Sequence, residues 1–187
     1  MTKSIKLLCV ALEAELPTPP PNATVIYTGV GKVQAATRLA QALCKSTKPD
    51  LIVNYGTAGG LNPMIKGMHE IGTFAQRDMM AEPQAPRGTV PFSDPALGDI
   101  GTASPVMQVR CGTGDSFVMA PDPWFVTADI DCVDMEGYAL AYVAQQYGIP
   151  FRSFKYISDM ADENAAEEWS KNVADGAEQF LELFAKL

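Results

Sequence analysis

Apolar positions along the chain alternate between two spacings, which predict strands and helices in turn. Short runs of aliphatic and β-branched residues are typical of buried strands, and they cover residues 5–11, 23–28, 50–55, 70–76, 106–110, 130–133 and 151–157. Apolar residues spaced by three and four predict helices over residues 33–45 and 135–147. We expect a last helix with one apolar face, formed by Trp169, Val173, Ala177, Phe180, Leu181 and Phe184.

Strands that alternate with helices predict an α/β fold with a largely parallel sheet covered on both faces. The chain has 187 residues, which is within the reach of one domain, and it shows no repeat, low-complexity tract or linker. We therefore expect one domain over residues 1–187. The longest irregular stretch, residues 79–104, is rich in proline and glycine, and such loops often belong to a site or an interface.

The composition narrows the classes of partner. The formal net charge is −8, from 14 Lys and Arg against 22 Asp and Glu. Because an acidic surface repels phosphates, we expect no binding to nucleic acid or to an anionic membrane. No apolar run is long enough to cross a bilayer. The first run stops at Glu13 without a cleavage pattern, so it predicts a strand rather than a signal peptide.

The four cysteines are far apart in the sequence, and none of them belongs to a Cys-x-x-Cys pair. The single histidine, His69, does not complete a zinc site with them at any usual spacing, so no metal is expected. Reduced thiols in a cytoplasmic protein are the simplest interpretation.

Acidic residues and glycines follow directly after the predicted strands. Sheets of this class bind ligands beyond the carboxyl ends of their strands, where those ends meet at one edge. Glycines there allow a ligand to approach the backbone closely, and an aromatic ring can stack on a planar base. The residues expected at this edge are Glu13, Glu15, residues 29–32, residues 56–60, Phe117, residues 134–136, Ser158 and Asp159.

Each of these features has a structural explanation when it is taken alone. Residues 29–32 lack the spacing of a Walker phosphate loop, and Gln34 stands where a dinucleotide-binding fingerprint has glycine. Asp134 and Glu136 precede a predicted helix, where acidic side chains favour the helix dipole. Their occurrence at successive strand ends is what favours a ligand site.

Five segments in this order resemble the nucleoside phosphorylase/nucleosidase superfamily, and in particular its methylthioadenosine/S-adenosylhomocysteine nucleosidase branch. They are residues 11–15 (ALEAE), 28–32 (TGVGK), 54–61 (NYGTAGGL), 133–136 (VDME) and 157–162 (ISDMAD). The resemblance runs from the first strand to the last helix and is weakest over residues 79–123. It implies a three-layer αβα sandwich with a central mixed, largely parallel sheet. It also implies a homodimer that cleaves the N-glycosidic bond of a purine nucleoside without a cofactor.

The resemblance also implies roles for three carboxylates. Asp159 would be the general acid that protonates the purine at N7, Glu136 would bind the ribose hydroxyls, and Glu15 would position and deprotonate the attacking water. This chemistry needs carboxylates because the departing base leaves an oxocarbenium-like cation. The resemblance places a second group of residues around the substrate: Met135, Phe117, Val118, Thr57, Ala58, Gly59, Val30 and Lys155.

The sequence favours hydrolysis over phosphorolysis. A phosphorylase must hold a phosphate dianion with arginines and backbone amides. Asn54 stands where a phosphorylase would have an arginine, and Lys155 is accompanied by Glu15 and Glu136. A purine or other nucleoside phosphorylase and a non-catalytic nucleoside-binding protein are the alternatives. A Rossmann-type dinucleotide enzyme is excluded by the missing glycine.

The chain departs from the family pattern between residues 76 and 129. Residues 76–79 replace an expected His-Asp stretch, and residues 95–105 leave no room for a helix that the family usually has there. Methylthioadenosine, adenosylhomocysteine, a futalosine-like nucleoside and a plain purine nucleoside all stay open as substrates.

Overall fold

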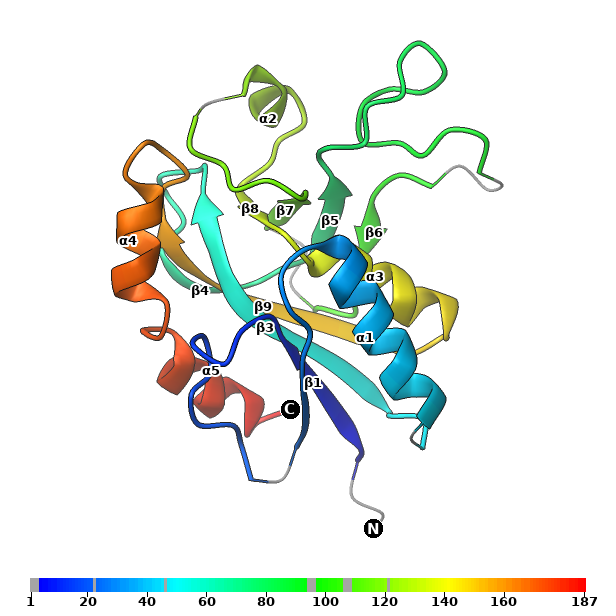
Figure 1. Ribbon diagram of the computed structural model, residues 1–187, viewed down its shortest axis with the longest axis vertical. Helices are drawn as coiled ribbons and strands as arrows, with labels where there is room; N and C mark the ends of the chain where they lie inside the picture. The colour runs from blue at the N-terminus through cyan, green and yellow to red at the C-terminus, as the bar shows by residue number, and fades with distance from the viewer. Residues whose placement is uncertain (1–3, 22, 46, 94–96, 106–108, 121) are drawn as a thin grey trace.

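The protein is a mixed, mostly parallel β-sheet flanked by helices (Figure 1). The computed structural model describes residues 4–21, 23–45, 47–93, 97–105, 109–120 and 122–187. Its strands are β1 (Lys6–Val10), β2 (Thr24–Tyr27), β3 (Leu51–Gly60), β4 (Gly67–Glu70), β5 (Thr73–Gln76), β6 (Ile100–Gly101), β7 (Arg110–Thr113), β8 (Cys132–Asp134) and β9 (Phe151–Asp159). Its helices are α1 (Lys32–Lys45), α2 (Pro123–Thr127), α3 (Gly137–Gln146), α4 (Ala165–Asn172) and α5 (Ala177–Phe184).

Strand β3 organises the sheet. Its first half pairs in parallel with β1 on one edge, and β9 runs parallel along the other edge as far as the end of β3. At its last two residues, Gly59 and Gly60, β3 also pairs with the antiparallel β8. The carboxyl ends of the parallel strands β1, β3 and β9 therefore lie at one edge of the sheet, and the short antiparallel strand β8 meets them there through its pairing with Gly59 and Gly60.

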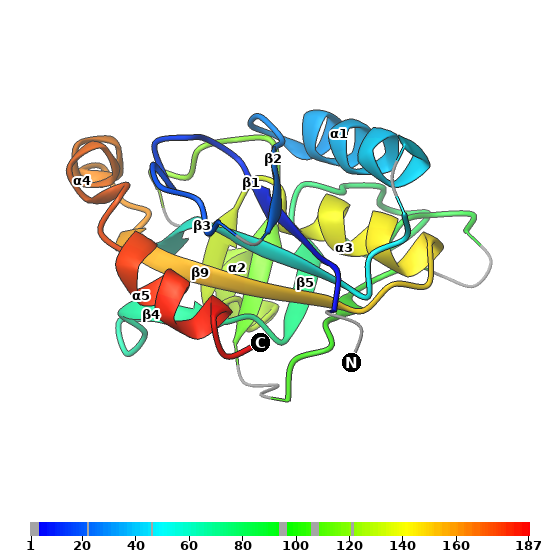
Figure 2. The same cartoon turned by 90° about the horizontal axis from the view of Figure 1, so that it is seen from below.

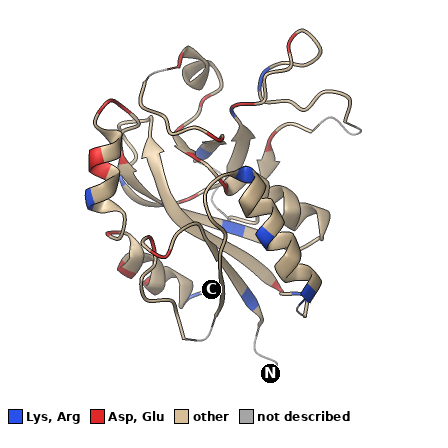
Figure 3. Ribbon diagram, in the orientation of Figure 1, with Lys and Arg blue, Asp and Glu red and all other residues tan. Residues whose placement is uncertain are grey.

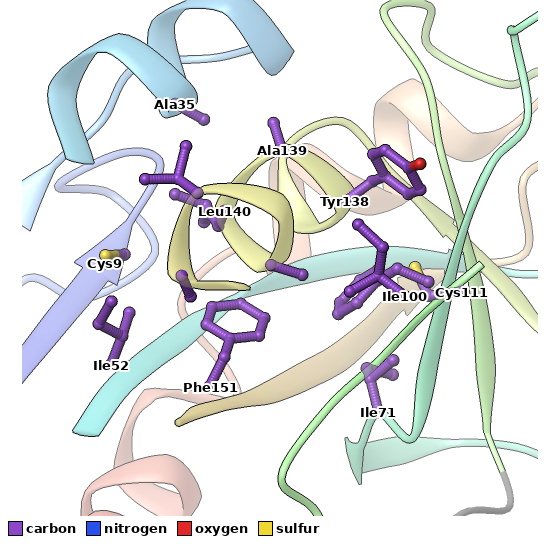
Figure 4. Close-up of a cluster of buried hydrophobic side chains, with 14 of the residues drawn as sticks. Cys9, Ala35, Ile52, Ile71, Ile100, Cys111, Tyr138, Ala139, Leu140 and Phe151 are labelled. Carbon is purple, nitrogen blue, oxygen red and sulfur yellow. The ribbon is translucent and has the colours of Figure 1, made fainter. Parts of the chain in front are cut away.

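The two faces of the sheet are covered by different helices (Figure 2). In β1, Leu7 and Cys9 pack in the core under α1 and α3, whereas Leu8 and Val10 pack with α5 on the other face. Figure 4 shows Leu140 of α3 close to the first of these cores. Apolar side chains of β1 therefore point to both sides of the sheet, and the αβα sandwich expected from the sequence is confirmed.

Most expected elements occur within a few residues of their predicted bounds, but five expectations need correction. The run 70–76 forms two strands, β4 and β5, because the chain leaves the β9 pairing at Ile71 and joins β7. The expected strand 106–110 begins with residues 106–108, which lie outside the described residues, and β7 extends forward to Thr113. Helix α2 was not expected. Strand β3 continues through the glycines to Gly60 instead of ending at Tyr55.

The expected last helix is two helices, α4 and α5. They are separated around Gly176, whose backbone lies against Tyr156 of β9. A Cβ atom on Gly176 would lie 2.5 Å from the Cβ atom of Tyr156. Across the described parts of the chain, no helix has the length and apolar character needed to cross a membrane.

Candidate active site

A cavity of about 420 Å³ opens where β1, β3, β8 and β9 end. It is lined by ten of the eleven residues that the sequence nominated: Glu15, Val30, Thr57, Ala58, Gly59, Phe117, Val118, Met135, Glu136 and Asp159. The lining also includes Ala11, Leu12, Arg77, Ser116, Val133, Asp134, Ala166, Trp169 and Ser170. Side chains that are far apart in the sequence thus face one space, and four of them are carboxylates: the three nominated ones and Asp134.

Glu15 lies in the turn after β1 and is only 4% exposed. Its Oε1 atom accepts hydrogen bonds from the backbone N–H and the hydroxyl of Thr57, both at 2.8 Å. Its Oε2 atom accepts from the backbone N–H of Leu12 at 3.1 Å. These three donors hold the carboxylate in a fixed orientation at the cavity wall. A buried carboxylate needs such hydrogen bonds because it has lost its contacts with water.

Glu136 stands between β8 and α3 and is 7% exposed. Its Oε1 atom accepts a hydrogen bond of 2.8 Å from the backbone N–H of Gly31. Burial raises the pKa of Glu136 to about 7. The positive charge of Lys155 opposes this shift, and the negative charges of Asp134 and Glu15 add to it. The group therefore changes its charge close to neutral pH.

Asp159 is the last residue of β9 and is also buried. Its Oδ2 atom accepts from the Ser158 hydroxyl at 2.7 Å, and its Oδ1 atom accepts from the backbone N–H of Ala161 at 3.0 Å. The strand β3 passes very close to this carboxyl group: a Cβ atom on Gly59 would lie 2.9 Å from Oδ1. Glycine at position 59 is therefore what allows Asp159 to face the cavity.

Lys155 does not line the cavity, contrary to the sequence-based expectation that it touches the substrate. It is fully buried, and its Nζ atom lies 2.8 Å from Oδ2 of Asp134. Burial alone would lower the pKa of Lys155, but the charges of Asp134 and Glu136 raise it above its usual value. Burial would conversely raise the pKa of Asp134, but Lys155 and hydrogen bonds lower it. The two groups form a buried ion pair in which Asp134 belongs to the cavity lining and Lys155 lies behind it.

Asp134 also performs the capping role that the sequence left open. Its Oδ2 atom accepts from the backbone N–H of Gly137 at 2.8 Å, whereas the Glu136 side chain makes no capping bond to the helix. Its Oδ1 atom accepts from the Thr113 hydroxyl. Both acids of the segment 134–136 line the cavity, but Asp134 is engaged by Lys155, Thr113 and Gly137, whereas Glu136 makes no bond to the helix.

Arg77 is a cavity-lining residue that was not nominated. It follows β5 and is buried, and its guanidinium donates to the carbonyl oxygens of Gly112, Gly114 and Ser116 and to the Ser116 hydroxyl. These bonds hold the segment that carries Phe117, whose ring is 45% exposed at the cavity. The sequence did offer a signal for this residue, because Arg77 directly follows the apolar run that forms β5 and a strand end is where site residues are expected.

Trp169 of α4, which the sequence places on the apolar face of the last helix, lines the cavity together with Ala166 and Ser170. Its indole Nε1 atom donates a hydrogen bond of 3.0 Å to the Thr57 hydroxyl. Apolar residues at helical spacing occur both on helix faces that pack in a core and on helix faces that line a cavity. The spacing alone therefore does not show which of the two Trp169 belongs to.

All four cysteines are free, three of them buried and Cys44 exposed. In the part of the chain that the structure describes, no group of three or more His, Cys, Asp or Glu residues is placed to hold a metal ion.

Comparisons with known proteins identify the family of the chain. Residues 21–187 match the family profile of the phosphorylase superfamily. A 5′-methylthioadenosine/S-adenosylhomocysteine nucleosidase of Arabidopsis thaliana is 31% identical over 179 residues, which cover 87% of this chain and 67% of that protein. The nucleosidase of the same name from Haemophilus influenzae is 30% identical over 184 residues, covering 88% and 76%.

Solved structures show the same fold. A mutant Helicobacter pylori nucleosidase with 5′-methylthioadenosine in its active site superposes with a TM-score of 0.85 at 19% identity, covering 99% of both chains. The futalosine hydrolase of Helicobacter pylori gives a TM-score of 0.83 at 20% identity, covering 98% of both chains. The resemblance seen in the sequence is confirmed, and the chain belongs to the phosphorylase superfamily.

Proposed function

We propose that this protein is a nucleosidase that hydrolyses the N-glycosidic bond of a purine nucleoside such as 5′-methylthioadenosine or S-adenosylhomocysteine. The observation that carries the proposal is the convergence of three buried carboxylates, Glu15, Glu136 and Asp159, on one cavity. The names of the relatives from Arabidopsis thaliana and Haemophilus influenzae support the same activity. The products are the free base and a ribose derivative.

Asp159 serves as the general acid at the base. As the glycosidic bond breaks, the electron pair of that bond moves to the purine, and a proton delivered to N7 allows the base to leave neutral. The bonds from Ser158 and Ala161 fix the carboxyl group in one orientation for this transfer. Phe117 stacks on the base, and the backbone of Val118 binds its edge.

Glu136 binds the ribose hydroxyls. One of its oxygens accepts from Gly31, and the other makes no hydrogen bond within the described part of the chain, so it is available to the sugar. Met135 packs against the ribose. When Glu136 is ionised, its negative charge also stabilises the positive charge that develops on the ribosyl ring. Val30, Ala58 and Gly59 complete the sugar side.

Glu15 positions the water and takes its proton while the water oxygen bonds to the anomeric carbon. Water rather than phosphate is favoured as the nucleophile because no cation in the described residues is free to hold a dianion at the cavity. Arg77 is bonded to backbone carbonyls and to Ser116, and Lys155 is paired with Asp134. Asn54 bonds to Cys9 O and accepts from Ser153 within the core.

We also propose a cytoplasmic homodimer of single-domain chains. The described strands all belong to one sheet, which supports one domain. Val30 and Phe117 line the cavity and are 40% and 45% exposed, and a second copy of the chain would cover such apolar groups at the rim. A mass measurement in solution tests the dimer, and a monomer at micromolar concentration would contradict it.

The test of activity is the release of free base from methylthioadenosine, adenosylhomocysteine, adenosine and inosine, each with and without phosphate. We expect release that does not need phosphate. A strict requirement for phosphate would identify a phosphorylase, and binding without turnover would identify a nucleoside-binding protein. Asp159→Asn should lower base release at least about 100-fold at unchanged circular dichroism. Normal release by this variant would remove the general-acid role.

A further inference from the structure

We propose that Trp169 is a positioning residue that orients Glu15 through the hydroxyl of Thr57. This role rests on the proposed function, in which Glu15 receives the proton of the attacking water. Three polar atoms form a chain across the cavity wall: Nε1 of Trp169 lies 3.0 Å from Oγ1 of Thr57, and this oxygen lies 2.8 Å from Oε1 of Glu15.

The direction of the chain follows from the chemistry of its members. An indole N–H can only donate a hydrogen bond, and a hydroxyl has a single hydrogen. The Thr57 oxygen therefore accepts from Trp169, and its one hydrogen is directed to Glu15. Without the indole N–H, the hydroxyl of Thr57 can turn to accept from another donor or to donate elsewhere, and the carboxylate loses a fixed contact.

This arrangement also assigns different roles to the two oxygens of Glu15. Oε1 accepts two hydrogen bonds, both from Thr57, and these occupy its two lone pairs. Among the described residues, Oε2 accepts one hydrogen bond, from the backbone N–H of Leu12. The geometry thus points to Oε2 as the oxygen that takes the proton of the water, because it retains an open lone pair on a side chain that lines the cavity.

Helix α4 holds Trp169 in place beside two of the three candidate carboxylates, Glu15 and Asp159. Asn172, three residues further along the helix, donates a hydrogen bond of 2.8 Å to the carbonyl oxygen of Ser158, and the Ser158 hydroxyl bonds to Asp159. Ala165, at the start of α4, is fully buried. The first turn of α4 carries the acidic residues Glu167 and Glu168, and the helix accordingly shows red in Figure 3. Trp169 is thus presented from a helix that is anchored at both ends.

Trp169→Phe tests the role because it removes the N–H and keeps an aromatic ring in the cavity wall. The loss of one hydrogen bond of about 1 kcal/mol corresponds to about a fivefold lower kcat, with KM within about twofold. The matched control is Trp124→Phe. Trp124 is the only other tryptophan of the chain and does not line the cavity. The Cζ atom of Arg87 lies 4.4 Å from the centroid of the Trp124 ring. We expect this control to leave kcat unchanged.

A double-mutant cycle separates positioning from a purely structural role. In Thr57→Val the hydroxyl is absent, so Trp169→Phe should lower kcat no further. In Thr57→Ser the hydroxyl is retained, and Trp169→Phe should again cost about fivefold. Equal effects of Trp169→Phe in all three backgrounds would overturn the relay, as would an unchanged kcat in the single variant. Absence of base release by the wild-type protein would instead overturn the proposed function itself.

Discussion

Replacing Glu136 by glutamine should remove a large part of the pH dependence of folding stability between about pH 4.5 and pH 7. The side chain is buried, and its pKa is raised from 4.5 to about 7 in the folded protein. In this window the folded protein keeps a proton on Glu136 that the unfolded chain releases. The free energy of unfolding must therefore fall as the pH rises, because the folded state binds more protons than the unfolded state.

The magnitude follows from the shift. One pKa unit corresponds to 1.36 kcal/mol, so a rise of about 2.5 units amounts to about 3 kcal/mol once the pH exceeds 7. Glutamine has nearly the same size and can still accept the hydrogen bond from Gly31, but it does not ionise. We therefore expect the variant to gain about 3 kcal/mol of stability relative to wild type between pH 4.5 and pH 8.

Urea unfolding of both proteins at pH 4.5, 6 and 8 measures this difference, because the other titrating groups cancel in the comparison. Glu163→Gln, at an exposed position, is the matched control for the loss of one carboxyl group. The reasoning is refuted if Glu136→Gln follows the wild-type pH dependence to within about 0.5 kcal/mol.

Two further substitutions test the packing below the cavity. Lys155→Met leaves the charge of Asp134 buried without its partner and should lower the free energy of unfolding by about 3 to 5 kcal/mol at pH 7, whereas a loss under 1 kcal/mol would show that the pair is not needed. Gly137→Ala places a Cβ atom 2.1 Å from Cε1 of Phe74 and should cost about 1 to 3 kcal/mol. Gly101→Ala, with open space around the new Cβ atom, is its control, and equal losses in urea unfolding would contradict the clash.

Two of the three candidate carboxylates could be found from the sequence because their positions depend on one rule of topology. Glu15 follows β1 and Asp159 ends β9, and both strands are parallel to β3, so recognition of the strands was enough to predict that these two acids meet. Glu136 follows β8, which is antiparallel to β3 and reaches the same place because it pairs with Gly59 and Gly60. Errors of several residues in the predicted strand bounds did not change which acidic residues were expected at the strand ends. The rule needs only the order of strand and turn, which apolar runs and glycines mark clearly.

The position of Lys155 could not be derived in the same way. It precedes Asp159 by four residues in β9, which is about 13 Å along an extended strand, so it lies below the strand ends rather than at them. Its partner, Asp134, ends a strand that does not pair directly with β9. A buried lysine in an apolar run predicts that some acid must neutralise it. Which acid does so depends on the full strand order.

Trp169 shows a more general limit of apolar periodicity. Its helical stripe also includes Phe180, which stacks on Tyr55 at 4.3 Å in the core. Both aromatic residues leave bulk water, but one packs against the sheet and the other lines a cavity. The spacing is the same because a ligand pocket and a core both require apolar surface. What distinguishes them is the indole N–H, which needs an acceptor when it is buried and finds it in Thr57, next to Glu15. A tryptophan on such a stripe is therefore better judged by the partner of its nitrogen than by its periodicity.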